Sequence, residues 1–225
     1  MKKEGLLDEP EFSNIEKYLE SGNRTEVTDK IKKVTETINR INDGMTVREI
    51  LVWMNHNTVR LRNLSDSRKF KRTADEILKS KERTGCCDSS TLFTALARSK
   101  GIPTMQVITL NKEWGKRIAK GEAADLSGHY FTACYLQDIT GKSDWVLIDS
   151  DRSVQDVRDI RFYKLNKEDR NIDKNLYAFA YTRDYSDIEF NGMKIDSIKN
   201  MIKIQTDACR LCDINDFAWE EERER

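Results

Sequence analysis

The segment Gly85-Cys-Cys-Asp-Ser-Ser-Thr-Leu-Phe-Thr-Ala-Leu-Ala-Arg98-Ser-Lys-Gly-Ile-Pro103 contains the clearest structural pattern of the chain. The apolar residues Leu92, Phe93 and Leu96 predict a helix from about residue 86 to residue 99 with a buried face. Gly101-Ile-Pro103 ends it, because glycine suits a helix cap and proline cannot continue the helix. The segment therefore predicts a buried helix that begins with a cysteine.

Cys86 follows a glycine and occupies the first turn of this helix. Backbone N–H groups are unsatisfied there, and the helix end carries partial positive charge. Both effects favour the thiolate, which is the nucleophilic form of cysteine. The same N–H groups can bind the oxyanion of a tetrahedral intermediate. Cys86 is thus a candidate nucleophile, and the alternative is a small buried apolar residue.

The chain downstream of this helix reads as an antiparallel sheet. Strands are predicted at 105–110, 129–136, 145–149 and 177–181, with turn chemistry between Asp138 and Lys142. If 129–136 and 145–149 form a hairpin, Asp149 or Asp151 comes to lie near His129. Both aspartates have the same strand parity, so the hairpin alone does not choose between them. A structural histidine and a turn aspartate are the alternative reading.

The first 70 residues are predicted to be helical. Ile31, Val34, Ile38 and Ile41 form one helical stripe. Capping boxes at Thr46–Glu49 and Thr73–Glu76 predict two further helix starts. We expect an α+β protein with a helical region at 1–70, a catalytic core at 71–215 and a charged tail at 216–225.

Composition narrows the class of partner. The 225 residues contain 39 Lys and Arg and 39 Asp and Glu, so net charge gives no reason to expect nucleic acid or an anionic membrane. No apolar run approaches a membrane span, and the first residues lack the apolar core of a signal peptide. Five cysteines without regular spacing do not suggest a disulfide framework. We expect a cytoplasmic protein, with its oligomeric state left open.

Three blocks resemble the transglutaminase-like superfamily. They are the Cys86 segment, Gly128-His129 at the start of an aromatic strand, and Trp145-Val-Leu-Ile-Asp149. The resemblance covers about residues 70–152 and implies a papain-like core, with a nucleophile helix packed on an antiparallel sheet. It implies a catalytic triad of Cys86, His129 and Asp149, because the family spacing counted back from Arg98 reaches Cys86 and the last block favours Asp149.

The resemblance implies attack on an amide or ester carbonyl, without a cofactor. We see no residue set for a calcium site of the animal transglutaminase kind, and we expect no metal. A hydrolase acting on peptide or protein amides is the first expectation. A protein-glutamine transglutaminase or deamidase is the second, and a catalytically silent interaction domain is the third.

Segment 111–128 is long for a compact domain and ends at Gly128-His129. We expect it to border the active site and to gate access, with glycines 115, 121 and 128 as hinges and Trp114 over the acyl group. The alternative is a surface insertion that is helical around 112–124.

The other cysteines and His56 give weaker signals. Cys209-Arg-Leu-Cys212 lacks the second half of a zinc set and the setting of a thioredoxin motif. A disulfide between Cys86 and Cys87 would block the nucleophile. Cys134 is expected in the core, and His56 is expected to be structural or exposed.

Overall fold

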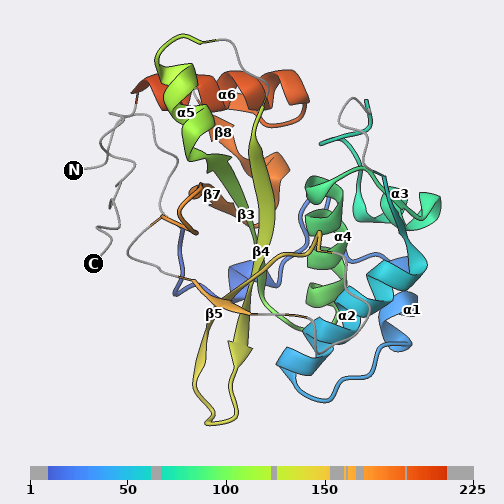
Figure 1. Ribbon diagram of the computed structural model, residues 1–225. Coiled ribbons are helices and arrows are strands. Elements are labelled where there is room, and N and C mark those ends of the chain that lie inside the picture. Colours follow the sequence, from blue (N-terminus) through green and yellow to red (C-terminus); the bar gives the residue numbers. More distant parts are fainter. Residues whose placement is uncertain are drawn as a thin grey trace.

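A five-stranded antiparallel sheet forms the centre of the molecule, in the order β6-β5-β4-β3-β7 (Figure 1). The computed structural model describes residues 10–61, 67–122, 126–152, 160, 162–165, 170–190 and 192–211. The central strands are β3 (Thr104–Asn111), β4 (Gly128–Gln137) and β5 (Ser143–Ile148), and the flanking ones are β6 (Tyr163–Lys164) and β7 (Leu176–Thr182). The predicted hairpin is therefore present as β4 and β5.

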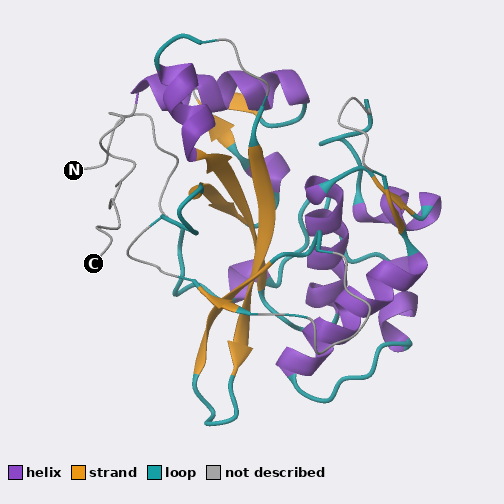
Figure 2. Cartoon of the chain, viewed as in Figure 1, coloured by secondary structure: helices purple, strands orange, loops and turns teal. Residues whose placement is uncertain are grey.

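Four helices lie together beside β4, as Figures 1 and 2 show. They are α1 (Asp29–Glu36), α2 (Asp43–Asn57), α3 (Ala74–Ser80) and α4 (Cys86–Ser99). Helix α4 packs on β3 and β4, and α1, α2 and α3 pack around α4. Their buried residues form one hydrophobic cluster with Cys134 and Leu136 of β4. The papain-like arrangement of a cysteine-bearing helix on an antiparallel sheet is thus confirmed.

The helix starts show where local sequence was sufficient. The predicted capping box at Thr73 is present, since Glu76 N–H donates to the Thr73 hydroxyl and Thr73 N–H donates to the Glu76 carboxylate at 2.8 Å. The one predicted at Thr46 is wrong. Helix α2 begins one turn earlier, because the Asn42 side chain accepts from Met45 N–H at 2.9 Å.

The helical stripe in the N-terminal region is shorter than predicted. Ile31 and Ile38 are buried, and Val34 packs at the edge of their cluster. Helix α1 ends at Glu36, and Ile41 is 68% exposed.

The C-terminal part adds short elements and one long helix. After β7 come the 3-10 turn η3 (Tyr185–Asp187), β8 (Glu189–Phe190), β9 (Met193–Lys194) and α6 (Ile198–Leu211). Helix α6 packs against α5 (Lys112–Ala119), and both lie at one end of the sheet in Figure 1. A parallel pair, β1 (Val59–Arg60) with β2 (Glu82–Arg83), leads into α4. The turn η1 (Glu16–Tyr18) packs its Tyr18 against Trp145 of β5.

Arg98 joins distant segments at the end of α4. Its side chain is 4% exposed and donates to the carbonyls of Tyr18, Thr104 and Arg183 at 2.6–2.9 Å and to the Thr25 hydroxyl at 2.9 Å. Burial lowers the pKa of Arg98 to about 10. The arginine that precedes Gly-Ile-Pro is therefore a structural anchor.

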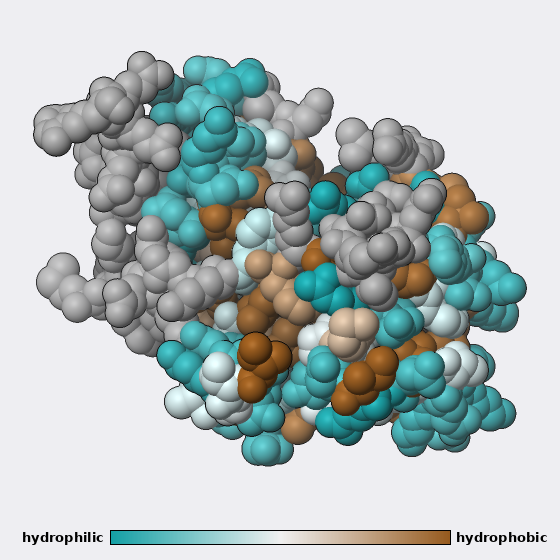
Figure 3. All heavy atoms as spheres, turned by 60° about the horizontal axis from the view of Figure 1, so that its bottom comes forward, coloured by the Kyte–Doolittle hydropathy of each residue, from teal (hydrophilic) through white to brown (hydrophobic). Residues whose placement is uncertain are grey.

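The surface does not present one continuous apolar face in the view of Figure 3. Hydrophobic side chains stand there in small groups between hydrophilic ones. In the described part of the chain, none of the helices is both long and apolar enough to cross a bilayer.

Candidate active site

Cys86 begins α4, directly after Gly85, and its side chain is partly exposed. Gly85 has a φ of +150°, a backbone conformation that other residues rarely adopt. The neighbouring Cys87 is 2% exposed. Burial raises the pKa of the Cys87 thiol well above its usual range, and the charges of Asp88 and Cys86 raise it further. Only Cys86 of this pair is both accessible and placed at the helix start.

Asp88 fixes the start of α4. It is 1% exposed, and its Oδ2 accepts from the Thr84 N–H and the Thr84 hydroxyl, each at 2.6 Å. Arg72 forms an ion pair with the same carboxylate. Because Thr84 precedes Gly85, this network holds the backbone that enters the first turn.

His129 enters the site from the start of β4. A side chain at the preceding Gly128 would place its Cβ 2.1 Å from the Thr109 carbonyl oxygen, so the close approach of β3 and β4 requires glycine. The Thr109 hydroxyl accepts from His129 N–H at 3.1 Å and donates to the His129 carbonyl at 3.0 Å. The Phe131 ring stands edge-on to the imidazole, with centroids 4.6 Å apart. The imidazole is thus fixed by backbone and by packing.

Asp149 directly follows the last residue of β5, and its carboxylate contacts the imidazole of His129. The His129 Nε2 and Asp149 Oδ1 atoms are 2.9 Å apart, so Nδ1 is the imidazole nitrogen that this contact does not use. Burial alone lowers the pKa of His129, but hydrogen bonds to Asp149 and Cys86 and the charges of both raise it to about 10. Burial acts to raise the pKa of Asp149, yet its hydrogen bond to His129 and the imidazolium charge hold it below its usual value.

Asp151 makes different contacts. It is 3% exposed, accepts from the Ser89 hydroxyl at 2.6 Å and forms an ion pair with Arg60. Its backbone N–H donates to Asp149 Oδ1 at 3.1 Å. Of the two aspartates that the hairpin left open, Asp149 contacts the imidazole and Asp151 ties α4 to β1.

Arg60 is a site residue that the sequence did not reveal. Its Nε donates to Asp151 Oδ2 at 2.9 Å, and that hydrogen bond raises the Arg60 pKa, with smaller contributions from the charges of Cys86 and Asp149. Arg60 lies on a two-residue strand 26 positions before Cys86, outside every motif. Its proximity follows only from the tertiary fold.

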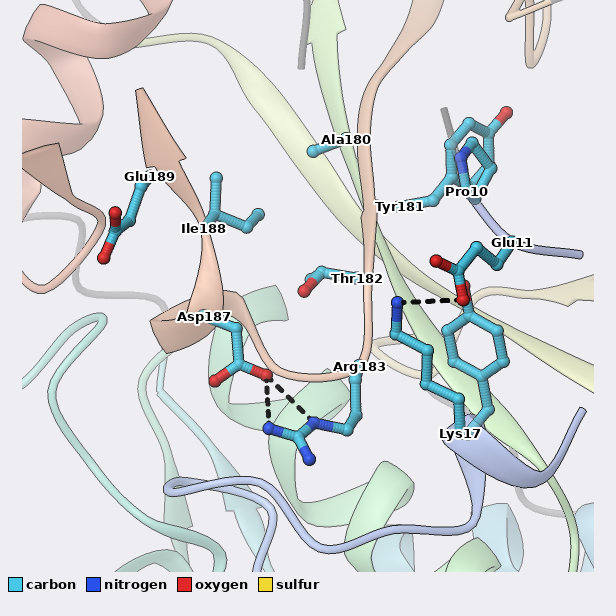
Figure 4. A pocket seen from close by; sticks show the side chains of 11 residues that line it. Pro10, Glu11, Lys17, Ala180, Tyr181, Thr182, Arg183, Asp187, Ile188 and Glu189 are labelled. Carbon is cyan, nitrogen blue, oxygen red and sulfur yellow. Dashed lines mark hydrogen bonds and ion pairs between the residues drawn. The ribbon is translucent and has the colours of Figure 1, made fainter. Parts of the chain in front are cut away.

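A cavity of about 630 Å³ opens over these residues. Its lining consists of Arg60, Leu61, Lys69, Phe70, Thr84, Gly85, Cys86, Cys87, Gly128, His129 and Asp151. The cavity in Figure 4, about 240 Å³, shares none of them. In that cavity Arg183 forms an ion pair with Asp187, and Lys17 forms one with Glu11. Cys86 and His129 both line the larger cavity.

Segment 111–128 differs from the gating loop that the sequence suggested. Residues 112–119 form α5, whose start is capped by Asn111, so the helical alternative describes this part. Gly115 lies inside the helix, and Trp114 is 4% exposed in the core rather than over Cys86. Gly128 does border the cavity. Residues 123–125 lie outside the described residues.

Cys134, Cys209 and His56 do not contribute to the candidate site. Cys86 and Cys87 both have free thiols, so the vicinal disulfide is not formed here. Cys134 and Cys209 are fully buried, His56 is exposed, and Cys212 lies outside the described residues. Within the residues that the structure describes, no three His, Cys, Asp or Glu side chains are grouped to hold a metal ion.

Comparison with known proteins shows which family the chain and its fold resemble. Residues 25–150, more than half of the 225, match the sequence profile of the transglutaminase-like superfamily. A solved structure described as a "putative cysteine protease" from Cytophaga hutchinsonii has a TM-score of 0.52 and 18% identity, over 81% of this chain and 53% of that one. The chain thus spans about half the length of that protein, and the likeness concerns the fold. No curated protein matches the sequence.

The matched range contains Cys86, His129 and Asp149, helix α4 and the three helices that pack around it. The chain belongs to the transglutaminase-like superfamily.

Proposed function

We propose that this chain is a cysteine-dependent acyl-transfer enzyme that hydrolyses peptide or protein amides. Cys86 is the nucleophile, His129 the general acid and base, and Asp149 the group that orients the imidazole. The carrying observation is the 2.9 Å contact of Asp149 with Nε2 of a histidine whose other nitrogen this contact does not use. Membership of a superfamily that contains cysteine-dependent enzymes supports the same reading.

The proposed reaction begins with an ion pair. A His129 pKa of about 10 keeps the imidazole protonated at neutral pH, and an imidazolium beside Cys86 favours the thiolate. The thiolate attacks the carbonyl carbon of the amide and pushes electron density onto the carbonyl oxygen. Backbone N–H groups of the first turn of α4 are the donors suited to that oxyanion.

The intermediate then collapses with cleavage of the C–N bond. His129 gives its proton to the leaving amine, and a thioester remains on Cys86. In the second half, His129 accepts a proton from water as the water oxygen attacks the thioester carbonyl. The carboxylic acid leaves, and the thiolate–imidazolium pair forms again. Asp149 holds the same imidazole nitrogen throughout.

Transamidation and deamidation share the first half of this reaction and differ in the group that resolves the thioester. The open cavity of about 630 Å³ above a partly exposed Cys86 admits water, which favours hydrolysis. The proposed substrate is a peptide or protein. The equal numbers of basic and acidic residues, 39 each, give no reason to expect nucleic acid or an anionic membrane as a partner. A role as a silent interaction domain predicts no turnover at all.

Mass spectrometry of a peptide library distinguishes these outcomes. The library is incubated with the protein, with and without a primary amine. Hydrolysis gives new peptide termini, and deamidation raises the mass of glutamine by about 1 Da. Transamidation replaces the side-chain NH2 of glutamine by the amine and releases ammonia. We expect new termini that disappear in Cys86→Ser. Amine incorporation without cleavage would replace the hydrolase by a transglutaminase, and no product in any arm would reject the enzyme.

A further inference from the structure

A second cavity, about 420 Å³, joins the reactive one beside Cys86. Lys69, Phe70, Cys86 and Gly128 line both cavities, so the nucleophile stands where they meet. The rest of the lining is mainly apolar and consists of Thr109, Leu126, Tyr130, Ile198, Met201, Ile202 and Gln205. This volume is in the range of pockets that hold small ligands. We call this second cavity the α6 pocket.

The wall of the α6 pocket is held by a strained residue. Phe70 has a φ of +60° and is 7% exposed, and its ring packs on Tyr130 at 5.6 Å between centroids. A bulky residue in this left-handed region is strained, and the surrounding structure must offset that strain. The Tyr130 hydroxyl in turn donates to the Met201 sulfur at 3.7 Å. Wall and floor are therefore built before any ligand binds.

The floor comes from outside the family region. Ile198, Met201, Ile202 and Gln205 belong to α6, whereas the family match ends at residue 150. The superfamily part of the chain thus supplies the nucleophile, and the C-terminal helix supplies the surface beside it. A pocket assembled in this way can set substrate choice without changing the reacting groups.

Gln205 adds one polar group to this apolar floor. It is 2% exposed, and its amide oxygen accepts no hydrogen bond from the residues that the structure describes. An unpaired buried acceptor is unfavourable, and a donor on a bound group removes that penalty. Apolar walls with aromatic faces and one free acceptor match an aromatic side chain that carries a hydroxyl, as tyrosine does.

We propose that the α6 pocket receives an aromatic side chain of the substrate, with tyrosine the best-matched residue, next to the carbonyl that Cys86 attacks. The inference rests on the proposed acyl-transfer function and names its substrate class. It makes α6 the specificity-determining element of this chain.

The test uses dipeptidyl acyloxymethyl ketones, which alkylate a reactive cysteine after binding as a substrate does. Three probes carry Ala-Ala, Tyr-Ala and Ala-Tyr before the reactive carbonyl, and labelling of Cys86 is followed by peptide mapping. We expect one tyrosine probe to label at least tenfold faster than Ala-Ala, a ratio within reach of one apolar pocket. In Ile202→Trp, which fills the pocket, that ratio should fall to about one.

Lys199→Trp is the matched control, because Lys199 is exposed on the same helix and should keep the wild-type ratio. Thermal melts show whether each variant is folded. If Ile202→Trp is not folded, the milder Ile202→Phe takes its place. Equal rates for all three probes, or a tyrosine preference that survives in the filled pocket, would overturn the inference. Failure of iodoacetamide and every probe to label Cys86 would instead reject the proposed function.

Discussion

Cys86 and Cys87 are neighbours in the chain but differ in environment, and this difference predicts their reactivity. Cys86 is partly exposed beside His129, whereas burial raises the pKa of Cys87 well above its usual range and that of Cys134 to about 12. With limiting iodoacetamide near pH 6, Cys86 should be alkylated first, because this partly exposed cysteine lines one cavity with His129, whose raised pKa favours the imidazolium. Peptide mapping identifies the site. Cys87→Ser should leave the pattern intact, and faster labelling of Cys87 or Cys134 would contradict the assignment.

Asp149 is expected to act through His129. Replacing it by asparagine removes the carboxylate charge that helps to raise the pKa of His129 to about 10, so that pKa should fall toward the ordinary 6.5. An NMR titration of the imidazole carbons reports it directly, with exposed His56 as the second signal. Loss of a correctly held acid and base should lower kcat/KM on the order of 10²-fold.

Asp138→Asn supplies the control, since this exposed turn carboxylate lies at the far end of the hairpin. An unchanged His129 titration in Asp149→Asn would show that the carboxylate does not govern the imidazole.

The site residues could be read from sequence only where local pattern places them. The glycine before Cys86 and the hairpin between His129 and Asp149 are local, so those three residues followed from spacing and resemblance. The hairpin alone left Asp149 and Asp151 open, and the family resemblance favoured Asp149. The structure adds that Asp151 contacts Ser89 and Arg60, which come from other elements. Arg60 itself had no signal, because its two-residue strand has no distinctive periodicity.

At the scale of the elements, we expect the pairing of β3 and β4 to depend on glycine at position 128. In Gly128→Ala the new methyl group would overlap the Thr109 carbonyl, so the strands must separate just where His129 begins. We expect a loss of about 1–3 kcal/mol in unfolding free energy, typical of overpacking, and slower labelling of Cys86. Urea denaturation measures the first effect.

Gly44→Ala is the comparison for this element. A Cβ at Gly44 meets its nearest atoms at 3.5 Å and lies inside a helix, so stability should stay equal or rise slightly. Equal stability of both alanine variants would refute the steric argument at Gly128.

Element prediction succeeded for α4, β4 and β5 because each has a strong pattern and clear ends. For 111–128 the sequence favoured a gating loop and gave the helix that became α5 only as the alternative. Gly115 and several lysines weaken the helical pattern there. The structure offsets this weakness by tertiary packing, because Trp114 and Ile118 are buried in one cluster with Met201 and Ile204 of α6. Such a gain depends on a segment that is 80 residues away and is invisible locally.

At the scale of the whole molecule, the contact between His129 and Asp149 makes the free energy of unfolding depend on pH. Below an unfolded pKa of 6.5, the preference of the folded state for protonated His129 contributes its full stability, and this is lost as pH rises through about 10. Asp149 has the opposite sign. Its contribution is present above 3.8 and is lost as pH falls through its lowered folded pKa.

Denaturation of wild type and His129→Gln at several pH values tests this expectation. The stability difference between them should shrink steadily between pH 6.5 and pH 10. A difference that stays constant over this window would mean that His129 titrates alike in both states. His56→Gln, which changes an exposed histidine outside the site, is measured in the same way as the control.

The position of β7 in the sheet has a consequence for how the protein is made. Strand β3 lies between β4 and β7, yet β7 begins at Leu176, 65 residues after β3 ends at Asn111. During synthesis on the ribosome, β3 and β4 can pair before β7 has been made. At a synthesis rate of roughly 5–20 residues per second, one edge of β3 then stays unpaired for several seconds. An open edge of this kind invites pairing with other chains. Nascent chains that stall before Thr182 are therefore the form of this protein that most needs a chaperone.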